Sequence, residues 1–187
     1  LQKTKMISQT IYRAFNILKL EKNTYEEISK DNTSIFGSGI IITIAGFVNV
    51  YLFKLFILPT LPNEVPLTAV FLIWIFFNWY IFSNVMLRIV KLFGGSKNLK
   101  NKKIAYSLIG FSNTAEILKI LIILFPNFIV IISWSILMLV IASQVVGIKQ
   151  IYNLEKIGSA VGVVILSYVA QFFIIGFLVI FLIKLAY

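Results

Sequence analysis

Hydrophobic residues along the chain are grouped into five long runs, separated by short polar segments. Each run approaches the roughly 20 residues that an α-helix needs to cross about 30 Å of hydrocarbon. We therefore predict an all-α integral membrane protein, with a five-transmembrane-helix bundle as one membrane domain over residues 35–187. The predicted spans are residues 35–58, 66–90, 104–125, 128–148 and 157–183.

Composition supports this class. The chain is 59% hydrophobic and only 13% charged, which leaves too little polar surface to coat a soluble globule of 187 residues. The third run is the least regular, because it contains Glu116 and Lys119. The uncharged stretch from Lys119 to Lys149 is long for one crossing and too short for two. Either the third run crosses the membrane, or it is re-entrant and the total is four spans.

Positive charge helps to choose between these readings, because short cytoplasmic loops carry an excess of Lys and Arg. With five spans and a cytoplasmic N-terminus, most of the 17 Lys and Arg residues fall inside. Four spans would place Lys149 and Lys156 outside. We therefore favour five spans in a prokaryotic plasma membrane, with the C-terminus outside.

The loop after the second predicted span is strongly basic. Its positive charge could serve only to keep the loop on the cytoplasmic side of the membrane, or it could also bind anionic lipid headgroups. The basic residues of this cytoplasmic loop and its flanks are Arg88, Lys91, Lys97, Lys100, Lys102 and Lys103.

Polar side chains also fall inside the predicted spans. Glu116 and Lys119 are three residues apart, so they share a helix face and can pair. Glu116 lies too deep to reach water, and amides that faced lipid would leave their hydrogen bonds unmade. We therefore expect an intramembrane polar network, with Gln144 lying nearer the inner face. Its expected members are Glu116, Lys119, Asn49, Asn78, Asn113 and Gln171.

Two interpretations of this network remain open. The polar side chains could be interhelical fasteners, or they could form a proton, ion or small-solute path in which Glu116 titrates. A second packing signal lies in the fifth run, where Gly158 and Gly162 form a G-x-x-x-G step that permits close helix packing, within the chain or in a homodimer.

Residues 1–34 form a separate cytoplasmic or interfacial segment. Ile7, Ile11, Phe15 and Leu18 fall on one helical face, so we predict an amphipathic helix at about residues 6–20 that lies in the headgroup layer. Further on, the sequence "TYEE" resembles a capping box between Thr24 and Glu27 and predicts a short helix at about residues 25–30.

The chain lacks the residue types that several kinds of catalytic or metal site require. The chain has no Cys and no His, and Asp31 is its one Asp, so we expect no thiolate or imidazole metal site, no intramembrane aspartyl protease and no cofactor. No Gly-rich phosphate loop is present. We therefore expect that the protein is not an enzyme. The net charge of +10 is spread by membrane topology, which argues against nucleic-acid binding.

The segment "KLFGGSKNLKNKKIAYSLIGFSNTAEIL" begins at Lys91 with a basic Gly–Gly loop and continues into the third span. In this order of features the chain resembles the Yip domain family, five-span membrane proteins named in eukaryotes for interaction with Ypt/Rab GTPases, and it looks like a prokaryotic-type member. Gly110, Phe111 and Ser112 occupy the place of the family's Gly-Tyr-small step. The resemblance implies five spans and a cytoplasmic N-terminus.

Two functions are expected from these features. The first is a non-catalytic scaffold or accessory subunit of a larger membrane complex, whose partners are the lipid bilayer and other membrane-protein subunits or a second copy. The second is a small transporter or channel-like protein in which Glu116 titrates. A sealed bundle centre would favour the first function, and a cavity that reaches Glu116 would favour the second.

Overall fold

The computed structural model describes residues 2–56 and 65–186, and most of these residues are helical, with no strand among them. The last two residues of the first predicted span, 57 and 58, lie outside the described residues. The helices are α1 (Gln2–Leu18), α2 (Lys22–Lys30), α3 (Ser34–Phe56), α4 (Val65–Leu92), α5 (Lys102–Ser112), α6 (Thr114–Ile117), α7 (Leu121–Leu124), α8 (Ile129–Tyr152) and α9 (Ile157–Ala186), with 3₁₀ turns η1 (Leu118–Ile120) and η2 (Pro126–Phe128).

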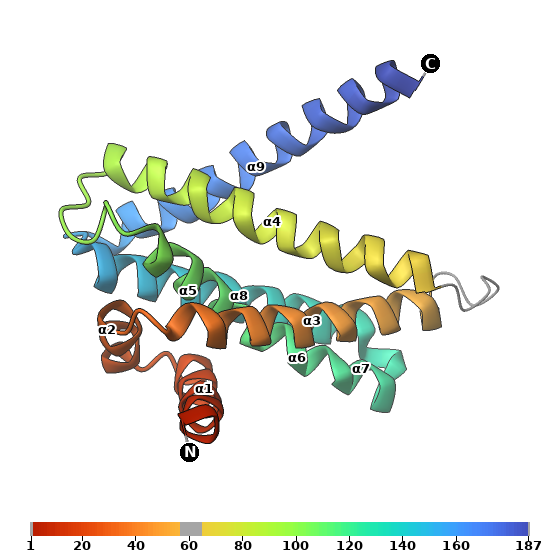
Figure 1. The fold of residues 1–187 in the computed structure, drawn as a ribbon, viewed down its shortest axis with the longest axis horizontal. Helices are drawn as coiled ribbons and strands as arrows, with labels where there is room; N and C mark the ends of the chain where they lie inside the picture. The colour runs from red at the N-terminus through yellow and green to blue at the C-terminus, as the bar shows by residue number, and fades with distance from the viewer. Residues whose placement is uncertain (1, 57–64, 187) are drawn as a thin grey trace.

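Five helical stretches of the described chain are long and apolar enough to cross a membrane, so the predicted all-α membrane bundle is confirmed. The third stretch is one of the five, which makes a re-entrant third segment unnecessary. Successive stretches run back and forth along the bundle (Figure 1). Their bounds are Ser34–Phe56, Thr68–Leu92, Lys102–Leu124, Pro126–Tyr152 and Ile157–Phe181.

The third stretch departs from the prediction of one continuous helix over residues 104–125. It is interrupted at Asn113, whose backbone N–H is shared between the carbonyls of Ile109 and Gly110 at 3.2 Å each. The Asn113 side chain also donates to the Ile109 carbonyl at 2.7 Å, and such local bonds compete with the regular helix ladder. Further along, η1 winds the chain as a 3₁₀ turn, which often marks strain or a functional hinge.

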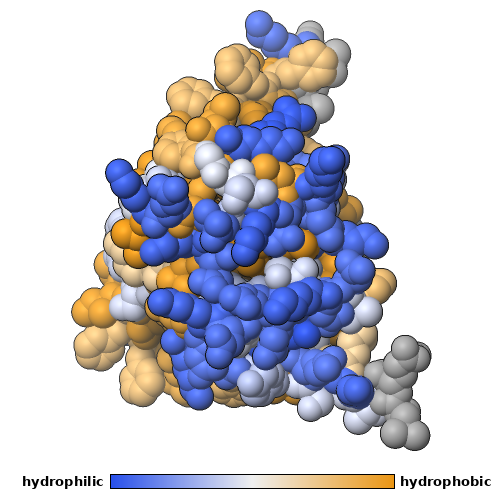
Figure 2. Space-filling model, turned by 90° about the vertical axis from the view of Figure 1, so that its left-hand side faces the viewer, coloured by the Kyte–Doolittle hydropathy of each residue, from blue (hydrophilic) through white to orange (hydrophobic). Residues whose placement is uncertain are grey.

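One end of the bundle is polar. We call it the polar end; it consists of α2, the loop of residues 93–101 and the turn of residues 153–156. Figure 2 looks onto this end and shows hydrophilic side chains gathered across it. In Figure 1, α1 and α2 are seen almost end-on, so they lie across the direction of the spans.

The hydrophobic core lies in the half of the bundle nearest the polar end. Tyr25, Met86, Leu108 and Ile148 are fully buried there, from four different helices. Gly147 permits this packing, because a Cβ at that position would lie 2.3 Å from Leu108 Cδ1 and 2.7 Å from Tyr25 Cδ1. Toward the other end, α4 and α9 diverge (Figure 1), and large side chains of both helices are exposed. The bundle is therefore tightly packed at one end and splayed at the other.

Close contact between α3 and α5 depends on Gly110. A Cβ on Gly110 would lie 2.4 Å from the Cβ of Ser38, so no larger residue fits without moving α3. The next two residues, Phe111 and Ser112, are buried. The Gly-aromatic-small step of the sequence thus lies at a close contact between the first and third spans.

The amphipathic helix α1 meets the bundle with its more polar face. Thr10, Arg13 and Asn16 are buried, whereas Ile7 and Phe15 are exposed. Arg13 Nη1 donates to Asp31 Oδ2 at 2.6 Å, which ties α1 to the α2–α3 junction. The exposed apolar face suits a helix that rests on hydrocarbon at the membrane surface.

The predicted capping box of α2 is wrong. The helix begins at Lys22, its N-cap Glu21 makes no side-chain capping bond, and Thr24 is buried inside the first turn. The reason lies in the preceding turn: Leu20 adopts a positive φ of 58°, and the Glu21 N–H bonds to the Asn16 carbonyl. This C-terminal closure of α1 starts the next helix at once.

Candidate functional site

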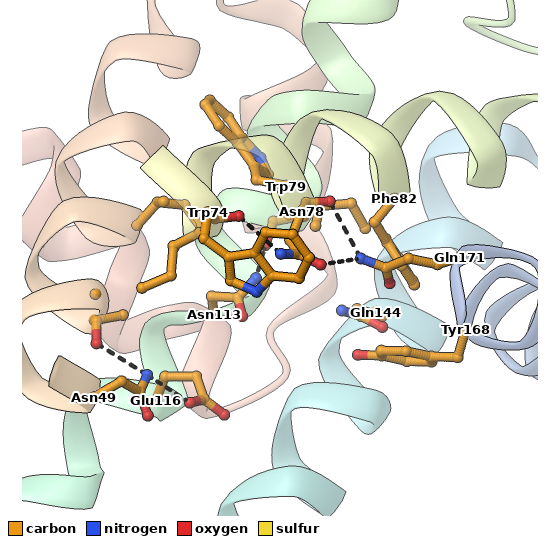
Figure 3. Close-up of a pocket in the computed structure, with 15 residues that line it drawn as sticks. Asn49, Trp74, Asn78, Trp79, Phe82, Asn113, Glu116, Gln144, Tyr168 and Gln171 are labelled. Carbon is orange, nitrogen blue, oxygen red and sulfur yellow. Dashed lines mark hydrogen bonds between the residues drawn. The ribbon is translucent and has the colours of Figure 1, made fainter. Parts of the chain in front are cut away.

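A cavity of about 290 Å³ lies where the packed and splayed halves of the bundle meet. Its walls come from α3, α4, α5, α6, α8 and α9, and Figure 3 shows the polar side chains that face it. Five of the six residues of the predicted polar network line this one cavity: Asn49, Asn78, Asn113, Glu116 and Gln171.

Asn49, Glu116 and Lys119 form one hydrogen-bonded cluster. Glu116 and Lys119 make an ion pair, and the Asn49 side chain joins both, since its Nδ2 donates to Glu116 Oε2 at 3.1 Å and its Oδ1 accepts from Lys119 Nζ at 3.0 Å. The side chains of Glu116 and Lys119 are 16% and 22% exposed. The cluster fastens α3 to the third span and carries no net charge.

Asn78 and Gln171 form a second, separate cluster. Gln171 Nε2 donates to Asn78 Oδ1 at 3.0 Å and lies 3.4 Å from the Asn78 carbonyl. The Asn78 side chain in turn donates to the carbonyl of Trp74 at 2.8 Å. This cluster fastens α9 to α4 (Figure 3).

Asn113 does not join either cluster through its side-chain nitrogen, which donates to its own helix. The six residues expected to bond one another therefore divide into two clusters on opposite walls and one residue that bends its helix. Depth along the spans predicted which residues lie at one level, but the direction in which each side chain points determined its partner.

Gln144 and Tyr168 also line the cavity. Gln144 is only 2% exposed, and its Oε1 accepts no hydrogen bond within the described part of the chain. Gln144 was expected nearer the inner face than the network, but it lines the same cavity, where Figure 3 shows it beside Tyr168. An amide in an otherwise apolar span was the available sequence signal. A buried acceptor without a partner costs about 1–3 kcal/mol unless water or a ligand supplies a donor.

Aromatic side chains complete the walls. Trp79, Phe82 and Trp74 line the cavity, and Trp79 Nε1 donates to the carbonyl of Tyr106 at 2.9 Å. The cavity thus combines amide groups with apolar surface, and its one carboxylate is already paired. Across residues 2–56 and 65–186, no group of three His, Cys, Asp or Glu residues could hold a metal ion. The arrangement suits water or a small molecule that forms hydrogen bonds.

The two glycines of the G-x-x-x-G step have different surroundings. A Cβ on Gly162 would lie 2.9 Å from the ring of Phe93, so Gly162 accommodates the end of α4. A Cβ on Gly158 would meet no described atom within 4 Å. Of the two glycines, Gly162 therefore supports close packing inside the chain.

The basic residues at the polar end also differ in whether they line a pocket. Arg88, Lys91, Lys100 and Lys102 line one pocket, whereas Lys97 and Lys103 do not line it. All six basic residues are exposed at the surface.

Comparison with known proteins gives one match. A family model described as the Yip1 domain matches residues 15–182, which extend from α1 to the last part of α9. Searches of curated proteins and of solved structures found no significant match. Because the match covers most of the chain, including all five membrane-spanning stretches, this protein belongs to the Yip1 domain family of typically non-catalytic membrane proteins.

Proposed function

We propose that this Yip1-family membrane protein is a non-catalytic scaffold or accessory subunit that binds another membrane protein between its splayed helices. The observation that carries the proposal is an apolar groove of about 530 Å³ between α4 and α9. It is lined by Val70, Phe71, Ile73, Trp74, Phe77 and Leu178.

The shape of the groove supports a partner helix. Lipid tails are as apolar as Leu, so helices associate in membranes through close packing of complementary surfaces rather than through hydrophobicity alone. Two diverging helices, with an aromatic wall on α4, provide such a surface, whereas α3 and α5 pack closely against each other. Val70 and Ile73, on the α4 side of the groove, are largely exposed in the single chain.

The first test is purification from native membranes in mild detergent, followed by identification of polypeptides that are retained in fixed stoichiometry. Val70→Trp would fill the groove and should release the partner. Val130→Trp is the matched control, because Val130 lies on α8 away from the groove and is exposed to a similar extent, 64% against 61% for Val70. If no polypeptide is retained, or if both variants retain the partner equally, the groove is not its binding site.

We also propose that the protein lies in a prokaryotic plasma membrane, that its polar end faces the cytoplasm and that its C-terminus is outside the cell. Lys97, Lys100 and Lys156 lie in the loop and the turn at that end, and this excess of positive charge supports the orientation. The chain has no Cys, so a single introduced Cys is its one reactive thiol and shows on which side of the membrane that position lies. Lys97→Cys at the polar end should resist a membrane-impermeant thiol reagent in intact cells, and Asn127→Cys at the other end should react. The reverse pattern would invert the topology.

A second candidate function is movement of a proton or small solute with Glu116 as the titrating group. It is supported by the cavity, which reaches Glu116 and contains the unpaired Gln144 acceptor. Proteoliposomes that contain the wild type or Glu116→Gln would be compared for dissipation of a pH gradient. Loss of flux with a folded variant favours this function. Loss of the folded protein would instead make Glu116 a structural fastener.

A further inference from the structure

A pocket of about 300 Å³ lies at the polar end, between the last turns of α4 and the start of α5. Four of its lining residues are cations: Arg88, Lys91, Lys100 and Lys102. No carboxylate lines it, and none of the ion pairs of the described chain includes any of the four. The pocket therefore concentrates positive charge that the protein itself does not neutralise.

The loop that carries Lys100 and leads into Lys102, the first residue of α5, is held in place by contacts with α4 and α8. The Ser96 N–H donates to the Tyr152 carbonyl at 3.1 Å, and Asn98 Nδ2 donates to the Ile151 carbonyl at 2.9 Å. The Gly95 N–H donates to the Val90 carbonyl at 3.1 Å, and Leu99 packs against the hydrophobic core. Lys100 thus lies on a loop that is held in place, and Lys102 is held in the first turn of α5.

The pocket also has an apolar and hydrogen-bonding floor. Leu87 and Leu99 line it together with Asn84, whose Nδ2 donates to the Tyr106 hydroxyl at 2.9 Å and so joins α4 to α5. The pocket lies where the second membrane-spanning stretch ends at Leu92 and the third begins at Lys102. Its cations are therefore at the level of the lipid headgroups, and its apolar lining, Leu87 and Leu99, belongs to the hydrophobic core.

We propose that this pocket binds the phosphate-bearing headgroup of an anionic phospholipid. A topology signal requires only that lysines lie on the cytoplasmic side of a short loop. It does not require four cations to converge on one cavity while Lys97 and Lys103, in the same loop region, stay outside it. Basic pockets between spans at the membrane surface are suited to anionic headgroups, because charge attraction and apolar contact act on one ligand.

The test compares two double variants with the same net charge. Lys100→Gln with Lys102→Gln removes two cations from the pocket, and Lys97→Gln with Lys103→Gln removes two from outside it. Each purified protein is heated in neutral detergent with increasing phosphatidylglycerol, and the rise in Tm gives the apparent lipid affinity. Phosphatidylcholine and inorganic phosphate are the comparison ligands.

For the wild type we expect phosphatidylglycerol to raise the Tm more than either comparison ligand does. The pocket variant should bind phosphatidylglycerol about 30-fold more weakly, and the control variant should stay within about threefold of the wild type. Equal weakening of both variants would overturn the proposal in favour of diffuse charge attraction. An equal response to inorganic phosphate would assign the pocket to a free anion and overturn the lipid proposal.

If the double pocket variant does not fold, two variants with one substitution each provide the test. Lys91→Gln is then compared with Lys97→Gln, and about a fivefold loss of phosphatidylglycerol affinity is expected for Lys91→Gln alone. Similar affinities in these two variants would overturn the proposal. Neither comparison depends on whether a partner protein occupies the groove between α4 and α9.

Discussion

Replacing Lys119 by Met tests the Asn49–Glu116–Lys119 cluster most directly. Three contacts hold the cluster: the ion pair and the two bonds of the Asn49 amide. Lys119→Met removes the ion pair and one amide bond, while the methionine keeps most of the apolar volume. Glu116 then retains one hydrogen bond from Asn49 and no positive charge nearby.

The expected loss of stability follows from the burial of this pair. Removing one partner of a buried ion pair costs about 3–5 kcal/mol, because the other charge is left uncompensated. Both side chains keep some exposure, 16% for Glu116 and 22% for Lys119, so we reduce the expected loss to about 2–3 kcal/mol. Adding Glu116→Gln should recover part of this loss, because the amide needs no counter-charge.

The free energy of unfolding is measured by titrating a denaturing detergent into mixed micelles and following helix content by circular dichroism. Lys54→Met is the matched control: Lys54 lies in the last turn of α3 and has no ion-pair partner within the described residues. We expect the control to change stability by less than about 0.5 kcal/mol. If Lys119→Met costs no more than Lys54→Met, water in the cavity solvates Glu116 and the ion pair is not a fastener.

Three further predictions concern other contacts. Gln171→Leu should lower the free energy of unfolding by about 1 kcal/mol in the same titration, because interhelical hydrogen bonds in membranes have that order of strength; no loss would show that the α4–α9 amide bond contributes nothing. Gly147→Ala should destabilise by about 1–3 kcal/mol through overpacking against the buried side chains of α2 and α5. Gly158→Ala, its control, should be neutral or slightly stabilising, and a loss of stability there would instead indicate a contact with a second chain. Burial opposes ionisation of Asp31, but its hydrogen bonds from Thr33 and Arg13, together with the charge of Arg13, hold the pKa of Asp31 below its ordinary value. The contact between Asp31 and Arg13 therefore stabilises the docking of α1 at pH values above the ordinary pKa of Asp, and this stabilisation is lost as the pH falls below about 4. Limited proteolysis of α1 at a series of pH values should show the loss. The Asp31→Asn variant should show no such pH dependence.

The location of the spans could be read from the sequence, because hydrocarbon thickness requires a long apolar run for each crossing. The interruption at Asn113 could not, because it depends on a side chain that bonds to its own helix rather than to a neighbour. The start of α2 was missed for a related reason, since the turn at Leu20 closes α1 and begins α2 without any capping side chain.

The members of the cavity were partly predictable. Counting residues from the span ends gives the depth of each amide, and five residues selected in this way do line the cavity. The same count does not give the angle at which each side chain leaves its helix. The sequence therefore did not match Asn49 with Lys119 or Asn78 with Gln171, and it did not place Gln144 at the same cavity.

The Asn49 contacts also bear on how the protein is made. Asn49 is synthesised well before Glu116 and Lys119, so its helix is already in the bilayer when the third membrane-spanning stretch arrives. A charged residue at the centre of an inserting helix costs about 2.5–3.5 kcal/mol. Glu116 lies near the middle of the third stretch and Lys119 nearer its Leu124 end, and the waiting amide and their mutual ion pair reduce this cost. Membrane insertion of the third stretch is then a cooperative step in biosynthesis, because the first stretch assists a later one that would enter the bilayer poorly by itself.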